Sequence, residues 1–310
     1  MSNMAVIVDS TCNLPSSVLQ KYKISRVPLS YIVDGHLAAD PCDDEAILAL
    51  FKSGKFNRKF EVTTKPPAPE DFARCIIKRI KEGHKSIVVQ TVNRVQGDTY
   101  NHANIGASLV KKKLGDKQDV QIRVMDSRTV FAGQGLMVAE TVRRMSNGHD
   151  PVKVRRQLDD LSTKIHSFLV PKSPLVALER AKTRNEKAVG WGQAFVANTL
   201  GIHPILCVVN DSSYLAAKVF GFKNAAKQLF QHASKRIEAG KLLSPFVTIN
   251  YGGSIHQLKS LPGYEELSET AKRHKVTLIP AVMSLAGGIY TSVGSISLAM
   301  ATDTHEWHGD

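Results

Sequence analysis

The chain has 310 residues, of which 43% are hydrophobic and 22% are charged, and its formal net charge is +13. This composition excludes the disordered and fibrous classes, and the length exceeds what one hydrophobic core fills, so two domains are expected. The lysines and arginines are spread along the chain with few aromatic residues among them, which favours an ordinary solvated surface over a nucleic-acid-binding stripe. We therefore expect no nucleic-acid partner.

The opening residues lack the basic start, apolar stretch and cleavage site of a signal peptide, so no export is expected. The longest weakly polar stretch, residues 280–300, is interrupted by serines and glycines and is too polar to span a membrane. It is predicted to be a loop region, and no transmembrane segment is expected. The four cysteines show no metal-ligand or redox-motif spacing: Cys12, Cys42, Cys75 and Cys207. They are expected to be reduced thiols, as in the cytoplasm.

The first half alternates short apolar runs with helical patterns, which is typical of βαβ units and a parallel sheet. The runs predict strands over residues 4–8, 26–33, 86–91 and 120–125. Apolar residues at helical spacing predict helices over residues 18–22, 43–52, 69–82, 98–113 and 135–145.

A basic helix over residues 152–161 is expected to bridge the two halves. In the second half, expected strands are joined both by helices and by short turns, which indicates antiparallel pairing. These strands cover residues 167–170, 204–209, 215–220, 245–251 and 276–281. The predicted fold is α/β with two domains: an N-terminal three-layer α/β/α domain with a mostly parallel sheet (residues 1–160), and a C-terminal two-layer α/β domain with a mixed or antiparallel sheet (residues 161–310).

Three polar stretches each follow an expected strand, where ligands gather in an open α/β sheet. They are Asp9-Ser10-Thr11, the segment 62–66 and the segment 93–100. Hydroxyls and free backbone N–H groups clustered in this way can hold an anion. Each stretch alone is weak evidence, because a serine or threonine after a strand is more often a helix cap.

Taken in order, these segments resemble the DegV family of bacterial fatty-acid-binding proteins. The resemblance covers nearly the whole chain. The similar segments are residues 8–15, Val27-Pro28-Leu29, Thr63-Thr64-Lys65-Pro66 with Phe72, Gly97-Asp98-Thr99-Tyr100, residues 124–127 with Gly133 and Gly135, residues 202–206 with Lys218, and residues 288–294.

The resemblance implies a two-domain protein whose C-terminal half buries an acyl chain while the carboxylate lies near the domain interface. It also implies that a separate ATP-dependent fatty-acid kinase phosphorylates this carboxylate, so the chain would be a carrier without catalytic residues, and a long-chain fatty acid would be its ligand. Burial of each methylene is worth about 0.8 kcal/mol, so the tail supplies affinity. Charge-assisted hydrogen bonds then orient the head group.

Carried over residue by residue, the resemblance places the lipid head group at Thr63, Thr64, Gly97 and Tyr290, and loop or pocket lining at Asn93, Ser292 and Gly294. Thr63 matches the family's head-group threonine. The family's head-group serine falls on Gly97, its histidine on Tyr290, and its arginine near Ala188, with Arg184 the nearest basic residue. The ligand and the transfer to a kinase thus depend on whether a glycine N–H and a phenol replace the family's groups.

Each of these positions also has a structural interpretation. Thr64 and Ser292 are compatible with turns, and Tyr290 with a core aromatic whose hydroxyl is satisfied. Gly97 and Gly294 are compatible with a backbone that needs positive φ.

No catalytic motif stands out in the sequence. It contains no nucleophile elbow, phosphate-binding loop, dinucleotide-binding turn or metalloprotease histidine pair. His305 and His308 flank Glu306 within the last six residues, where disorder is the default, so no metal site is expected. Two alternatives remain: a basic adaptor that binds nucleic acid or an acidic protein, and the same fold carrying a different amphiphilic carboxylate.

Overall fold

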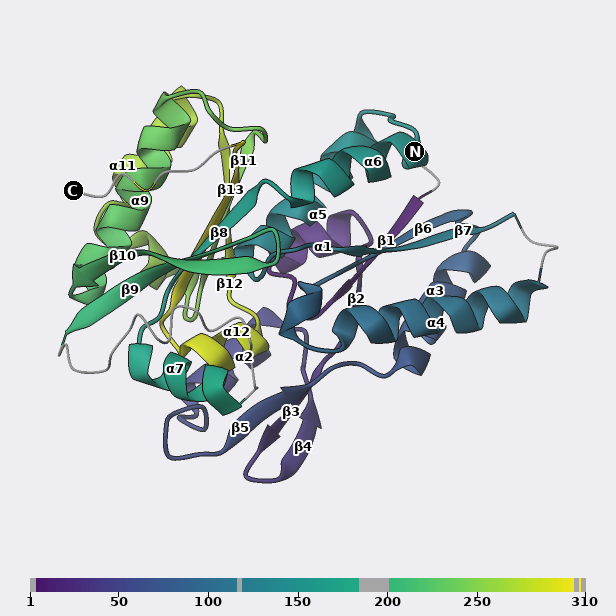
Figure 1. Cartoon of the computed structure of the whole chain (residues 1–310), viewed down its shortest axis with the longest axis horizontal. Coiled ribbons are helices and arrows are strands. Elements are labelled where there is room, and N and C mark those ends of the chain that lie inside the picture. Colours follow the sequence, from purple (N-terminus) through teal and green to yellow (C-terminus); the bar gives the residue numbers. More distant parts are fainter. Residues whose placement is uncertain (1–3, 116–118, 184–200, 304–306, 308–310) are drawn as a thin grey trace.

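The computed structural model contains two large β-sheets and one small one, and it describes residues 4–115, 119–183, 201–303 and 307 (Figure 1). The N-terminal sheet is parallel throughout, in the order β2-β1-β6-β7. Its strands are β1 (Met4–Asp9), β2 (Ser25–Val27), β6 (Ser86–Thr91) and β7 (Gln121–Asp126).

Helices cover both faces of the N-terminal sheet. One face packs against α3 (Pro69–Lys81) and α4 (Thr99–Leu114), and the other against α1 (Ser16–Lys21), α5 (Ala132–Ser146) and α6 (Pro151–Ser162). Helix α3 follows the sequence pattern closely, because Phe72 and Ile76 on its apolar stripe are fully buried. The predicted three-layer arrangement is confirmed.

The C-terminal sheet has the order β10-β9-β8-β13-β11-β12, antiparallel except for the β11–β12 pair. Its strands are β8 (Ile165–Val170), β9 (Ile202–Val209), β10 (Ser212–Phe220), β11 (Phe246–Tyr251), β12 (Thr277–Val282) and β13 (Ile296–Ala301). Helices α9 (Phe222–Glu238) and α11 (Tyr264–Arg273) pack on its outer face, and short α10 (Ile255–Lys259) precedes α11. The predicted mixed sheet is confirmed, whereas the boundary at residue 160, which falls inside α6, stays a prediction.

Helix α5 lies between the two large sheets and is buried on all sides from Ala132 to Val142. Leu136 and Met137 are fully buried in a core that contains residues of both sheets. At the start of the helix, the Thr248 hydroxyl of β11 donates to the Ala132 carbonyl at 2.6 Å. The helix is enclosed on every side, and its buried polar side chains have hydrogen-bond partners, so it joins the two halves.

The predicted loop region at residues 280–300 is wrong. It holds the end of β12, the helix α12 (Leu285–Thr291) and β13, which is an interior strand of the C-terminal sheet. The serines that make this stretch look polar are buried and hydrogen-bonded: Ser295 Oγ donates to the Ser292 carbonyl at 2.7 Å, and Ser297 Oγ lies 3.3 Å from Ser167 Oγ. A buried serine with a partner costs a strand little.

The single strand expected over residues 26–33 is also wrong, because it divides at Pro28. Residues before the proline form β2, and those after it form β3 (Ser30–Val33) of the small sheet, ordered β4-β3-β5. Proline lacks the N–H that would continue the ladder. The tight turn at Asp34-Gly35 leads into β4 (His36–Ala39), and β5 (Val62–Lys65) follows α2 (Asp44–Lys52). The small sheet thereby brings β5 beside α12 (Figure 1).

Among the described residues, no helix combines the length and the apolarity that crossing a membrane demands.

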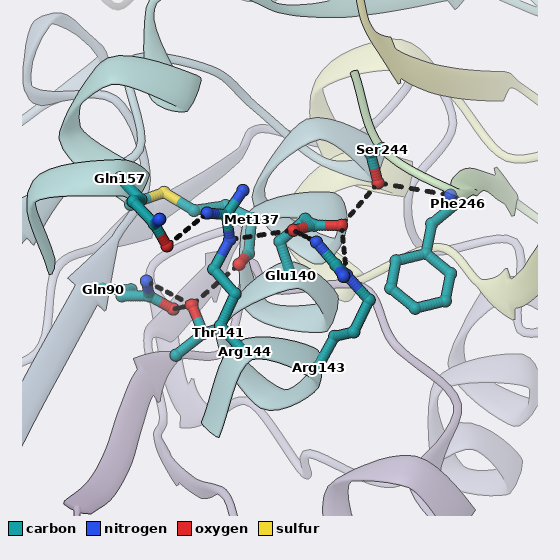
Figure 2. A network of polar contacts seen from close by, with 9 residues as sticks. All are labelled: Gln90, Met137, Glu140, Thr141, Arg143, Arg144, Gln157, Ser244 and Phe246. Carbon is teal, nitrogen blue, oxygen red and sulfur yellow. Dashed lines mark hydrogen bonds and ion pairs between the residues drawn. The ribbon is translucent and has the colours of Figure 1, made fainter. Parts of the chain in front are cut away.

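A buried carboxylate ties α5 to the C-terminal half (Figure 2). Glu140 is fully buried and accepts hydrogen bonds from Arg143 at 2.9 and 3.0 Å, from Arg144 at 3.0 Å and from Ser244 at 2.9 Å. Burial alone would raise the pKa of Glu140, but the hydrogen bonds from Arg143 and Ser244 and the two arginine charges outweigh it, so the pKa lies below its ordinary value. The charged network therefore stabilises the fold.

We predict that Glu140→Gln lowers the free energy of unfolding by about 2–4 kcal/mol at neutral pH, because the arginines lose their buried counter-charge. A carboxylate with a depressed pKa stabilises the fold above its unfolded-state pKa, and this stabilisation is lost as the pH falls through the folded-state pKa. Urea unfolding should therefore show the difference between wild type and variant narrowing below about pH 4.5.

The matched control is Glu238→Gln, because Glu238 is exposed and lies 3.5 Å from Arg273. A pair of this kind is worth about 0–1 kcal/mol. Equal destabilisation by the two substitutions at neutral pH would contradict the role assigned to Glu140.

Candidate functional site

A cavity of about 680 Å³ lies where the N-terminal sheet, the small sheet, α12 and the turn between β9 and β10 meet. This volume is within the range of roughly 300–1,000 Å³ that holds small-molecule ligands. The cavity follows the carboxyl ends of β1 and β6, as the open-sheet rule predicts. Its apolar wall consists of Leu29, Pro66, Val92, Val95, Val130, Phe131 and Ala286. Most of the described lining comes from the first half of the chain.

All four predicted head-group residues line this cavity: Thr63, Thr64, Gly97 and Tyr290. The Tyr290 hydroxyl accepts a hydrogen bond from the Thr64 N–H at 3.0 Å and lies 3.0 Å from Thr64 Oγ1 and 3.4 Å from Thr63 Oγ1. Three hydroxyls thus converge, although Tyr290 is 226 residues from Thr64 and 227 from Thr63 in the sequence. The cluster offers neutral donors to an anion.

Helix α12 carries Tyr290 to this position. Ser284 caps the helix by accepting from the Gly287 N–H at 3.2 Å, and its own N–H donates to Asn13 Oδ1 in the loop after β1. Gly288 allows close packing, because a Cβ there would lie 2.3 Å from the Phe51 ring. The Tyr290 ring packs with the cluster around Phe51 while its hydroxyl reaches the cavity. The packing and ligand-binding interpretations of Tyr290 are therefore compatible.

Gly97 precedes α4 at φ 137° and ψ −167°, a conformation that only glycine adopts readily. Its structural interpretation is thereby supported. Gly97, Asp98 and Thr99 line the cavity at the start of α4. The N-terminus of a helix carries a partial positive charge, which favours an anion.

The polar stretch that begins at Asp9, the last residue of β1, reaches the cavity at Thr11. Asp9 is fully buried and accepts hydrogen bonds from Val92 N at 2.7 Å, Thr11 N at 2.9 Å and Gln134 Nε2 at 3.2 Å. Burial raises the pKa of Asp9 despite these hydrogen bonds. The backbone N–H groups of Thr11 and Val92 therefore donate to Asp9, the protein's own carboxylate, and are not free to bind a ligand anion. Thr11 itself lines the cavity.

The three residues predicted as loop or pocket lining are not among those that line this cavity. Asn93 is buried and caps the short 3-10 helix η1 (Arg94–Gln96), because its Oδ1 accepts from Val95 N at 2.9 Å. Ser292 Oγ accepts from Ser173 N at 2.8 Å, and Gly294 adopts a positive φ of 87°. Ala188 and Arg184 lie outside the described residues.

Sequence reasoning missed two charged residues near the cavity. Arg180 of α7 (Pro174–Thr183) is buried and donates to the carbonyls of Ile289 and Phe56, the latter at 2.9 Å. Burial lowers the pKa of Arg180, and the neighbouring Tyr290 opposes this. Asp211 lines the cavity from the turn between β9 and β10. The Asn210-Asp211 dipeptide signals a turn in the sequence, but no local pattern shows that the turn reaches the site.

The described part of the chain contains no group of three or more His, Cys, Asp or Glu side chains arranged to hold a metal ion. His305, Glu306 and His308 fall outside the described residues.

The model of the family described as "Uncharacterised protein, DegV family" matches residues 3–303. A DegV domain-containing protein of Xanthomonas axonopodis pv. citri is 26% identical over 310 residues, covering 97% of this chain and 98% of that protein. A protein of Thermotoga maritima named "Fatty acid-binding protein" is 27% identical over 257 residues, covering 77% of this chain and 78% of that protein.

Among solved structures, a stearic acid-binding protein from Eubacterium ventriosum superposes with a TM-score of 0.77 at 20% identity. The superposition covers 96% of this chain and 98% of that chain, and it shows a shared fold. Because the family model spans almost the entire sequence, the chain belongs to the DegV family.

Proposed function

We propose that this protein binds one long-chain fatty acid in the cavity, with the carboxylate at Thr63, Thr64 and Tyr290. The observation that carries the proposal is the convergence of three hydroxyls in a cavity that also has an apolar wall. The naming of relatives as fatty-acid-binding proteins supports it. Burial of each methylene is worth about 0.8 kcal/mol, so this wall suits a hydrocarbon tail.

The head-group cluster is suited to a monoanion. In the free protein, the Tyr290 hydroxyl accepts from the Thr64 N–H, which leaves its own proton to donate to a neighbouring hydroxyl or to a bound carboxylate. The buried guanidinium of Arg180, close behind Tyr290, contributes positive potential. We infer that the tail extends from Thr63 toward α12 and the C-terminal domain, for which the proposed boundary is residue 160.

The proposed role is that of a carrier that presents the carboxylate to a separate kinase. Thr63 and Gly97 are exposed, so the head group would lie at the mouth of the cavity and not in the core. A kinase docked there would transfer the γ-phosphoryl group of ATP to a carboxylate oxygen, releasing ADP and leaving an acyl phosphate on the carrier. The carrier's part in this reaction is to hold one oxygen in line with the donor.

If the protein is purified without added lipid and extracted with organic solvent, we expect a long-chain fatty acid in up to one equivalent per chain. Native mass spectrometry gives the same stoichiometry as a mass increment lost on delipidation. Release of another amphiphilic carboxylate would keep the cavity as the binding site and change the identity of the proposed ligand. A delipidated protein with no measurable affinity for fatty acids of any length would contradict the proposal.

Substitution of the head-group hydroxyls separates positioning from affinity. Thr63→Val removes a donor and keeps the shape, and Tyr290→Phe removes the hydroxyl at which the cluster converges. A hydrogen bond to a charged group is worth about 1.5–3 kcal/mol, so each variant should bind hexadecanoate roughly 10–100-fold more weakly at most, while the buried tail keeps binding measurable. Phosphorylation by a fatty-acid kinase should fall by a larger factor than binding does, because orientation is lost.

Matched controls are Thr163→Val and Tyr22→Phe, since neither residue lines the cavity. Both should bind hexadecanoate as the wild type does. Wild-type binding and wild-type phosphorylation in both Thr63→Val and Tyr290→Phe would disprove the assigned head-group site.

A further inference from the structure

Four charged residues form a cluster beside the cavity, where the two halves of the chain meet. Arg94 donates to Asp211 Oδ2 at 3.1 Å, and its Nε lies 3.5 Å from Asp126 Oδ2. Arg128 lies 3.5 Å from the same Asp211 oxygen. Arg94 begins η1 after β6 and Arg128 lies in the loop after β7, whereas Asp211 comes from the C-terminal half. The cluster is therefore a contact between domains.

Asp211 is the member of this cluster that lines the cavity. Asn210 and Asp211 both adopt positive φ, 44° and 66°, in the tight turn between β9 and β10. The Asp211 N–H donates to the Arg128 carbonyl at 3.1 Å, which holds the turn against the N-terminal domain. Asp211 Oδ1 is buried and has no hydrogen-bond partner among the described residues. Only one carboxylate oxygen therefore engages the arginines.

The charge of the cavity suits a fatty acid better than its phosphorylated form. Among the described residues, the lining includes the carboxylates Asp98 and Asp211 and no lysine or arginine. Phosphorylation replaces the single negative charge of the carboxylate with a phosphoryl group that carries about 1.5 to 2 negative charges at neutral pH. The neutral hydroxyls at Thr63 and Tyr290 do not balance that charge, and Arg180 is already bonded to backbone carbonyls. A further cationic group is needed, and Arg94 and Arg128 lie directly behind Asp211.

We propose that Arg94 and Arg128 form a phosphoryl-binding site at the rim of the cavity, which Asp211 occupies with its own carboxylate until a phosphorylated amphiphile displaces it. The inference rests on the proposed function and adds a second, anion-specific subsite to it. Guanidinium groups bind phosphate oxygens bidentately, and phosphate offers more acceptor oxygens than a carboxylate does. Arg94 suits this exchange because its side chain is 52% exposed. Displacement of Asp211 also loosens the contact between the domains.

The test compares two amphiphiles of matched chain length, hexadecanoate and hexadecyl phosphate, by calorimetric titration of the delipidated full chain. The double variant Arg94→Gln/Arg128→Gln should bind hexadecyl phosphate at least about tenfold more weakly than the wild type and hexadecanoate less than about threefold more weakly. Asp211→Asn keeps the shape of the turn and removes the competing charge, so it should bind hexadecyl phosphate several-fold more tightly. Arg273→Gln, on α11 of the outer helix layer, is the matched control and should change neither affinity.

The outcomes separate the two proposals. If the wild type binds hexadecanoate but its affinity for hexadecyl phosphate does not change in either the double variant or Asp211→Asn, the phosphoryl site is overturned and the fatty-acid proposal stands. If the wild type binds neither amphiphile, the fatty-acid proposal fails and the phosphoryl site fails with it. We expect Asp211→Asn to bind hexadecyl phosphate more tightly, and a misfolded protein would not. The single variant therefore still decides the test if the double variant misfolds.

Discussion

The enclosure of α5 between two β-sheets is the constraint on which the rest of this structure depends. One face of the helix completes the N-terminal α/β/α sandwich, and the other covers the inner face of the C-terminal sheet. Because the same side chains serve both cores, the domains cannot pack independently of each other. Buried polar contacts fix the helix at two points, with Thr248 at its start and Ser244 on Glu140 near its middle. Strand ends of the N-terminal and small sheets and the β9–β10 turn of the C-terminal sheet therefore meet at one cavity.

The cavity owes its chemistry to segments that are distant in sequence. Strand β5 supplies two threonines, α12 supplies a phenol, and the β9–β10 turn supplies a carboxylate. Apolar residues after β2, β5, β6 and β7 form most of the wall between them. An amphiphilic anion fits this division, because the wall suits a tail and the hydroxyls suit a charged head. The ionic cluster at Arg94 and Asp211 adds a second charged region where the two domains touch.

The sequence predicted the layers well, because the period of the apolar residues decides them. Phe72 and Ile76 marked α3, and the alternation of strands and helices marked the parallel sheet. Prediction failed where a polar residue is buried with a partner: Ser295 and Ser297 made an interior segment look like a loop. Four head-group positions inferred from family resemblance line one cavity, but Arg180 and Asp211 could not be found, since only the tertiary fold brings them near Tyr290 and Arg94.

The most direct test of the central claim is a crystal structure of the delipidated protein with hexadecanoic acid bound. The account predicts continuous density for a tail along the apolar wall of the cavity, with the carboxylate about 2.5–3.2 Å from the hydroxyls of Thr63 and Tyr290. A carboxylate bound away from this cluster, or a tail that lies outside the cavity, would contradict it.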